Sequence, residues 1–421
     1  MILKTYNCNS FNVHTVKTDK FKTCHMEIIF RKDILKEDMS TYSFLCDILT
    51  DCSKKYPQKK DVIIRLEELY KAVLYGLCSR LGNTLFTSFV YEFIEPTYIN
   101  DDNYLEDVIK FPFSMIQEPL VTNEEFDQKT FNIIKKRYIN EIKSIEDDGY
   151  KLSLKKLFNT LEDTSPTSYS TFGSVTDLEK ITPASLYKVY KSFYKDNICD
   201  IFIIGNLDMD LVVTHIKKYF KNRVINNKKI DLFVENKVKN KCSVVHDKAN
   251  FVQTHVNVIY NLVGFTKYER DIVFNLYNYI LCSGGLTSKL YLDIREKNSL
   301  CYSIDSMYLK FDNLFLLHLS LDDENKEKAI KLIKKGVKEM ALGDFTETDI
   351  ENAKRSIRMS LDLSLDNIVA ILNNCAFNYF DDLPLLEERK KLLMDVTKED
   401  IVNVAKKLKI NTAFMLSGGE E

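Results

Sequence analysis

Two stretches of the chain, residues 181–206 and 396–420, repeat the same order of polar and hydrophobic positions. Each opens near a threonine, Thr182 or Thr397, and threonine is a residue type preferred at helix N-caps. Hydrophobic residues then recur at intervals of three, four and seven, which is the period of an amphipathic helix, and a short hydrophobic run ending in glycine follows. We therefore predict a helix leading into a buried strand in both stretches. The helical positions are Leu186, Val189, Tyr190 and Phe193 in the first stretch and Ile401, Val404, Ala405 and Leu408 in the second.

The similarity extends over both halves of the chain. Each half has two alternating segments around a two-residue turn signal, Gly82–Asn83 in the first and Asp312–Asn313 in the second, which predicts a β-hairpin. An amphipathic helical pattern precedes each hairpin, at 61–72 and at 286–297. The repeat predicts two copies of one α+β domain, each a mostly antiparallel sheet with helices on one face. The other expected elements are strands at 25–30 and 254–263 and helices around 106–117, 126–145, 326–341 and 345–363.

A polar segment separates the two copies. Residues 221–243 are rich in lysine and asparagine and show neither helical nor strand periodicity. We therefore interpret them as a linker whose run of charged side chains is solvated. We place an N-terminal domain at 1–222, the linker at 223–243 and a C-terminal domain at 244–421.

Composition excludes several classes of protein. The 59 basic residues nearly balance the 61 acidic ones, which is unlike the basic surface of a nucleic-acid-binding protein. The first residues lack the apolar core of a signal peptide, and no run approaches the roughly 18 apolar residues of a membrane span. The ten cysteines form no CxxC pair, so we expect reduced, mostly buried thiols in a cytoplasmic protein without a membrane partner.

The duplicated pattern resembles the pitrilysin/insulinase/mitochondrial processing peptidase family of metallopeptidases, the inverzincins, over essentially the whole chain. Two stretches carry the resemblance: "TFGSVTDLEKITPASLYKVYKSFYKDNICDIFIIGN", which is similar to the end of the family's first domain, and "LCSGGLTSKLYLDIREKNSLCYSIDSMY", which is similar to a signature of its second. The resemblance implies the metallohydrolase fold that LuxS shares with the processing peptidases.

The resemblance also locates a degenerate zinc motif. Active members carry HxxEH on a helix of the first domain, where two histidines bind zinc and the glutamate is the general base, and a later glutamate is the third ligand. In "TYSFLCDIL", Ser43 and Asp47 stand at the histidine positions and Cys46 at the general base, and Glu141 is the candidate downstream ligand. This donor set implies no metal in this chain. In the alternative, purely structural interpretation, Cys46 is a small residue that fills apolar packing and Asp47 is a solvated helix residue.

A second set of family residues is present. Arg295 and Tyr302 stand where members have an arginine and a tyrosine that bind the substrate carbonyl and stabilise the oxyanion, and Gly284 and Gly285 precede them in register. The resemblance thus implies that all four contact substrate and that Arg295 and Tyr302 act catalytically in trans. Outside the resemblance, an arginine near a helix end is usually a dipole or ion-pair partner, a strand tyrosine is usually core, and paired glycines usually make a turn.

Three hypotheses about function follow. The chain is similar to the zinc-lacking subunits of bacterial heterodimeric peptidases of the YmfF type, which implies a homologous partner bearing HxxEH and zinc, with a peptide or precursor peptide as substrate. It could instead be an inactive peptide-binding or scaffold pseudoenzyme. The third hypothesis is a self-sufficient metal enzyme that uses Cys46, Asp47 and Glu141.

Overall fold

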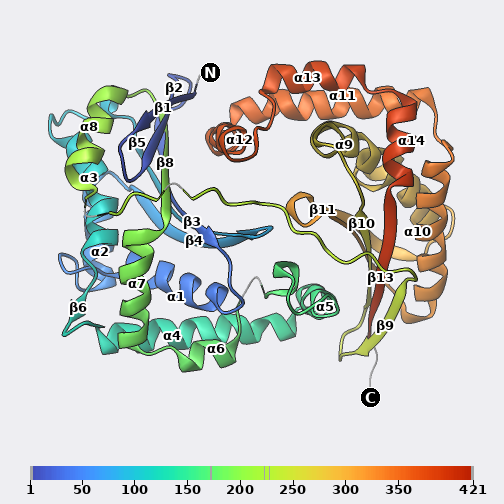
Figure 1. Ribbon diagram of the computed structural model, residues 1–421, viewed down its shortest axis with the longest axis horizontal. Helices are drawn as coiled ribbons and strands as arrows, with labels where there is room; N and C mark the ends of the chain where they lie inside the picture. Colours follow the sequence, from blue (N-terminus) through green and yellow to red (C-terminus); the bar gives the residue numbers. More distant parts are fainter. Residues whose placement is uncertain (1–2, 171–172, 222, 227, 419–421) are drawn as a thin grey trace. The chain divides into compact units, whose positions relative to one another are not determined.

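The computed structural model describes residues 3–170, 173–221, 223–226 and 228–418 (Figure 1). The described residues form two compact units. One consists of Met1–Lys143, Ser170–Leu232 and Ile368–Ala376, and the other of Ser144–Tyr169, Phe233–Asn367 and Phe377–Glu421. The predicted boundaries follow the sequence repeat, whereas each compact unit also includes a short segment from the other half of the chain.

The first unit contains a six-stranded sheet in which four of the five neighbouring pairs are antiparallel. Only the β2–β8 pair is parallel. Phe30 on β3 lies with its ring centroid 4.4 Å from that of Phe193 on α7, so the helices cover this face with aromatic packing. The strands in spatial order are β1 (Leu3–Asn7), β2 (Asn12–Lys17), β8 (Ile198–Gly205), β3 (Thr23–Asp33), β5 (Thr84–Ile94) and β4 (Val73–Leu81). The helices are α1 (Asp38–Asp51), α2 (Lys59–Glu68), α3 (Tyr104–Gln117), α4 (Gln128–Lys143), α6 (Val175–Lys180), α7 (Pro183–Asp196) and α8 (Met209–Tyr219).

The second unit repeats this strand order without a counterpart of β1. Its five strands run β11–β12–β10–β13–β9, just as β4–β5–β3–β8–β2 run in the first sheet, and the pair at the far end, β13–β9, is again the parallel one. This shared order confirms the predicted fold of two homologous, mostly antiparallel domains. The strands are β9 (Ser243–Lys248), β10 (Thr254–Leu262), β11 (Cys301–Leu309), β12 (Leu314–Leu321) and β13 (Leu408–Ser417).

Helices lie on both faces of the second sheet. The main core packs side chains such as Val258 and Leu317 against the larger group of helices, while Leu152 and Leu157 of α5 (Gly149–Phe158) pack on the opposite face against Ile259. The other helices of this unit are α9 (Phe274–Asn278), α10 (Lys326–Ala341), α11 (Glu347–Leu363), α13 (Leu386–Asp395) and α14 (Lys398–Lys406). Helix α12 (Ile368–Asp381) is divided between the two units after Ala376.

The repeated helix–strand stretches form as the pattern predicts. The Thr182 and Thr397 side chains each accept a hydrogen bond from a backbone N–H three residues on, so both are N-caps, of α7 and α14. The strands that follow, β8 and β13, are almost wholly buried. The predicted helix at 286–297 is less regular, because a 3₁₀ turn at Gly285–Thr287 precedes a π-helical turn at Tyr291–Glu296.

The segment between the repeats is more tightly packed than its composition predicts. The described residues of 223–242 form neither helix nor strand, but Leu232 and Val234 are buried. The Leu232 carbonyl accepts a hydrogen bond from the Asn83 N–H at 3.0 Å, and the Val234 N–H donates to the Phe311 carbonyl at 2.8 Å. These two apolar side chains therefore anchor the segment, a contact that its polar composition did not indicate.

Two broader properties concern thiols and helix length. All ten cysteines are free, and each is buried or half-buried, as the absence of CxxC pairs predicts. Within the part of the chain that the structure describes, no helix has the length and apolar character required to cross a bilayer.

Candidate functional site

Cys46, which the resemblance predicts at the position of the general base, is buried in the packing of α1 against β4. Its thiol donates to the Leu77 carbonyl at 3.5 Å, and Gly76 makes the close approach possible, because a Cβ there would lie 2.7 Å from the Cys46 Cβ. Burial raises the pKa of the Cys46 thiol far above its ordinary value. Cys46 is thus a neutral filler of the helix–strand contact and is unsuited to activate water.

Ser43 lies one turn earlier on α1 and is half-buried. It is hydrogen-bonded to the Cys78 thiol on β4 and to the Tyr138 hydroxyl on α4. Burial raises the pKa of Cys78 to about 12, with the bond from Ser43 opposing the rise. The hydrogen bonds of Ser43 therefore go to neutral polar groups on β4 and α4.

Asp47 and Glu141 are brought together by a residue that the sequence analysis did not single out. The Arg137 guanidinium on α4 lies 3.3 Å from the Asp47 carboxylate, 3.5 Å from that of Asp51 on α1 and 3.9 Å from that of Glu141. Burial raises the pKa of Asp47, and the Arg137 charge opposes that rise. A signal was available, since Arg137 stands four residues before Glu141, the spacing at which helical side chains of opposite charge meet.

These residues do not fit zinc. A zinc site needs three or four deprotonated N, S or O ligands at about 2.0–2.3 Å, whereas here the thiol is protonated against a carbonyl and a guanidinium lies among the carboxylates. Among the described residues, no group of three or more His, Cys, Asp or Glu side chains is arranged to hold a metal ion. The donor chemistry thus gives no support to a self-sufficient enzyme that uses Cys46, Asp47 and Glu141.

Arg295 and Tyr302 lie in the second unit and are both exposed. Arg295 is in the π-helical turn, with its guanidinium 5.0 Å from the centroid of the Tyr291 ring. Tyr302 is 58% exposed on β11, an edge strand of the sheet, and its hydroxyl donates to the Asp322 carboxylate at 3.4 Å. The prediction that Tyr302 lies on a strand and Arg295 near the end of the preceding helix is confirmed.

The backbone departs from regular strand pairing at Tyr302. Cys301 pairs with Leu321 and Ser303 with Ser320, so Tyr302 is an extra residue at a β-bulge. Bulges occur often beside active sites, where they redirect a side chain. Burial raises the pKa of the Cys301 thiol to about 11 and the Arg295 charge opposes the rise, so Arg295 lies near the residue that precedes Tyr302. Both side chains therefore belong to the same end of β11.

Gly284 and Gly285 have a conformational reason to be glycine. A Cβ on Gly284 would lie 2.6 Å from the Tyr279 carbonyl oxygen, and the Gly284 N–H donates to that oxygen at 2.9 Å. Gly285 has a φ of +65°, which glycine adopts without strain. The pair ends one helical segment and starts the 3₁₀ turn, and its contact with substrate remains a prediction.

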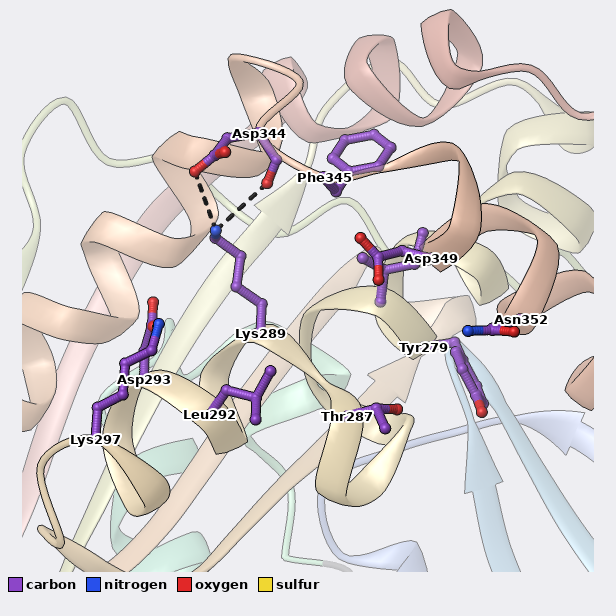
Figure 2. A pocket seen from close by; sticks show the side chains of 11 residues that line it. Tyr279, Thr287, Lys289, Leu292, Asp293, Lys297, Asp344, Phe345, Asp349 and Asn352 are labelled. Atoms are coloured by element: carbon purple, nitrogen blue, oxygen red, sulfur yellow. Dashed lines mark hydrogen bonds and ion pairs between the residues drawn. The ribbon is translucent and has the colours of Figure 1, made fainter.

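A cavity of about 180 Å³ lies beside the segment that carries Arg295, which itself is not among the lining residues (Figure 2). Lys289 reaches across it, with its ammonium 3.2 Å from the Asp344 carboxylate and 3.0 Å from that of Glu339. The lysine charge is therefore balanced by two carboxylates. Sequence analysis missed this cavity because its lining comes from segments about 50 residues apart, near 280–297 and 344–352.

Comparisons with known proteins agree with the fold. Residues 180–357 match the family model described as "Peptidase M16 inactive domain". The chain is 26% identical over 419 residues to the "Probable inactive metalloprotease YmfF" of Bacillus subtilis, covering 97% of this chain and 96% of that one.

Solved structures show the same fold over the full length. A conserved protein from Enterococcus faecalis superposes with a TM-score of 0.92 at 24% identity, covering 100% of this chain and 99% of that one. A peptidase M16 inactive domain from Pseudomonas fluorescens superposes with a TM-score of 0.80 at 17% identity, with the same coverage. The predicted resemblance to the M16 peptidases, the family of pitrilysin, insulinase and mitochondrial processing peptidase, is therefore confirmed: residues 180–357 match the inactive domain of that family, and the whole chain is similar to a probable inactive metalloprotease.

Proposed function

We propose that this chain is the non-zinc subunit of a heterodimeric metallopeptidase. It supplies Arg295 and Tyr302 in trans to a homologous subunit that carries HxxEH and binds the zinc. The observation that carries the proposal is the exposure of both side chains at one end of β11, with Tyr302 on a bulge. The burial of Cys46 and the Asp47–Arg137 ion pair support the same assignment, because they make these two motif positions unsuited to act as a base or as a zinc ligand.

The chemistry assigned to the pair is electrostatic. When a peptide carbonyl is attacked, its oxygen gains negative charge, and donors directed at that oxygen lower the barrier. Arg295 offers a permanently charged fork of N–H donors and Tyr302 a neutral hydroxyl on a rigid ring. Loss of one such donor typically costs about 2.7–4 kcal/mol of transition-state stabilisation, equivalent to about 10²–10³ in kcat. The zinc and the general base would belong to the partner.

A scaffold or peptide-binding pseudoenzyme is the second candidate. The observation in its favour is β4, an edge strand that exposes Val73, Tyr75 and Leu77. An extended peptide can add to an open edge through main-chain hydrogen bonds, with alternate side chains packing on the face. Such binding needs neither Arg295 nor Tyr302, so variants of these two residues distinguish the candidates.

The test begins with co-purification from the native host, which identifies the partner. Peptide cleavage by the reconstituted complex is then measured for Arg295→Ala and Tyr302→Phe. The matched controls are Arg358→Ala, at an exposed arginine of α11, and Tyr98→Phe, at a tyrosine that is 59% exposed. We expect each site variant to lower kcat/KM by about 10²–10³ without affecting assembly, and the controls to behave as wild type.

Two results would count against the proposal. Wild-type kinetics for both site variants would make the pair structural and favour the scaffold. About one tightly bound zinc per isolated chain, with chelator-sensitive peptidase activity, would show that the chain needs no zinc-bearing partner. Sequencing of the cleaved peptides then decides between processing of one precursor and general peptide turnover.

A further inference from the structure

Three helical segments of the second unit line a cavity of about 500 Å³. They are residues 269–283, which comprise α9 and the π-helical segments on either side of it, together with α11 and α13. Ile272 and Leu393 contribute buried lining, whereas Ser283 and Ser360 are exposed, so the cavity opens to the surface. A cavity of this volume has room for a small ligand.

Polar side chains occupy positions where packed helices usually bury a hydrophobic stripe. On α11, Ser356 and Ser360 line the cavity one turn apart, next to Ile357 and Leu361. A serine side chain is too short to fill the gap between two helices, so space remains where a leucine would pack. The lining therefore combines apolar surface with hydrogen-bonding groups.

The hydrogen-bonding part of the lining is rich in donors. The Oδ1 atom of Asn278 accepts a hydrogen bond from the Ser306 hydroxyl at 2.8 Å, so the NH₂ group of Asn278 is the end that can serve a ligand. The half-buried Arg389 carries five N–H donors in a planar fork, more than one contact within the chain uses. Donors grouped around a guanidinium are suited to the oxygens of a phosphate or carboxylate.

The carboxylate in this lining, that of Asp271, is already neutralised. Its side chain is 1% exposed, the Lys267 ammonium lies 2.8 Å away, and the Lys310 ammonium also contacts it. Burial lowers the pKa of Arg389, and the Asp271 charge only partly opposes that fall. The surroundings thus stabilise the Arg389 charge less well than water does, and an anion in the cavity would stabilise it.

We propose that this cavity binds a small organic anion. A phosphate or carboxylate group would accept hydrogen bonds from Arg389 and Asn278, and an apolar body would lie against Ile357 and Leu393. The guanidinium fork matches both kinds of head group, because each offers two oxygens to parallel N–H donors. The apolar lining favours an anion that carries a hydrocarbon or aromatic body over a bare inorganic ion.

Isothermal titration calorimetry of the full chain tests the proposal with four probes: phenyl phosphate, benzoate, inorganic phosphate and phenol. We expect phenyl phosphate or benzoate to bind at one site per chain, and the tighter of the two identifies the head group. Inorganic phosphate should bind more weakly than phenyl phosphate because it has no apolar body. Phenol, which has the body without the charge, should bind more weakly than the preferred organic anion.

Variants locate the binding. Arg389→Gln should weaken it by about 10- to 100-fold, because the charged donors are lost while the side chain keeps a similar length. Ser356→Leu keeps the charge but fills the cavity, so it should abolish binding. The matched control is Arg355→Gln, at an exposed arginine of α11 that is not among the lining residues, and it should bind as wild type does. The thermal midpoint of each variant without a probe shows whether it is folded.

Four results would overturn the proposal. They are no binding of either organic anion to wild type at millimolar concentration, equal affinity for phenol and phenyl phosphate, and an equal loss of binding in Arg355→Gln and Arg389→Gln. The fourth is wild-type affinity in a folded Ser356→Leu, which does not depend on whether Arg389→Gln folds. Arg295 and Tyr302 are not among the lining residues and no partner subunit is needed, so the proposal can fail independently of the proposed function.

Discussion

A buried pair of histidines should make the second unit sensitive to acid. His255 on β10 and His318 on β12 lie with their ring nitrogens 3.1 Å apart, and both are buried under α5. The Tyr150 ring is 4.6 Å from that of His318, and a Cβ on Gly149 would lie 2.6 Å from the His255 ring nitrogen. The two neutral rings can share one hydrogen bond, whereas a second proton would place two charges in contact away from water.

The size of the effect follows from the His318 pKa. Burial, with a smaller contribution from His255, lowers the pKa of His318 to about 3 from an ordinary value of 6.5. The unfolded chain therefore takes up a proton below pH 6.5 that the folded chain refuses until about pH 3, so stability falls as the pH falls through this window. One pKa unit corresponds to 1.36 kcal/mol, which gives a loss of about 2 kcal/mol at pH 5.

The neighbouring acids do not cancel this penalty. Asp148 precedes α5 and attracts a proton to His255, but burial outweighs it and lowers the pKa of His255 as well. Asp305 on β11 is opposite His318 in the sheet register, yet burial and the neighbouring His255 lower the pKa of His318. The pair should therefore remain neutral until the surrounding structure opens.

Hydrogen exchange read by mass spectrometry can measure this loss within one unit. After correction for intrinsic rates, we expect amides of β12 and α5 to open about 30-fold more often at pH 5 than at pH 7.5, the equivalent of about 2 kcal/mol. His318→Phe keeps a ring against Tyr150 and His255 and should lose most of this dependence. His246→Gln, at an exposed histidine on β9 of the same sheet, should keep it. An equal pH response in His318→Phe and wild type would refute the reasoning.

Two further predictions concern the first unit. Gly76→Ala should destabilise it by about 1–3 kcal/mol, because the new Cβ meets the Cβ and backbone of Cys46; an unchanged thermal midpoint would mean that α1 can move off β4 without cost. Asp200→Asn should cost about 3–5 kcal/mol in urea unfolding, because it leaves the Arg31 guanidinium, now 2.6 Å from the carboxylate, without its buried counter-charge. The matched change Asp210→Asn breaks an exposed pair with Lys4 and should cost less than about 1 kcal/mol, so equal losses would contradict the burial argument.

The fold could be predicted because the repeat consists of local sequence patterns. Helical period, N-cap threonines and hairpin turn signals each act over a few residues, and the duplication showed several of these patterns twice. The less regular parts depend on tertiary contacts. The segment 286–297 breaks into 3₁₀ and π turns, and Leu232 and Val234 become buried through hydrogen bonds with residues far away in sequence. Polar composition alone could not predict these contacts.

The residues of the candidate sites could be predicted from the sequence, but the contacts around them could not. Sequence placed Cys46 on α1, yet its inertness depends on the close approach of Gly76 on another element. Arg137 was overlooked because a charged residue on an exposed helix face normally needs no explanation, and only the packing of α4 against α1 brings it to Asp47. The bulge at Tyr302 likewise depends on the register of β12, which no local pattern specifies.

The contrast between the two units supports placing function in the second. In the first, each motif position is satisfied by packing or pairing: Cys46 fills a contact, Ser43 bonds neutral groups and Asp47 meets Arg137. In the second, Arg295 and Tyr302 stay exposed, and the bulge interrupts strand pairing to present Tyr302. An extra residue at a bulge on an edge strand interrupts the regular ladder of hydrogen bonds. Local departures of this kind are expected where a side chain acts on something outside the chain, which is the role proposed for this pair.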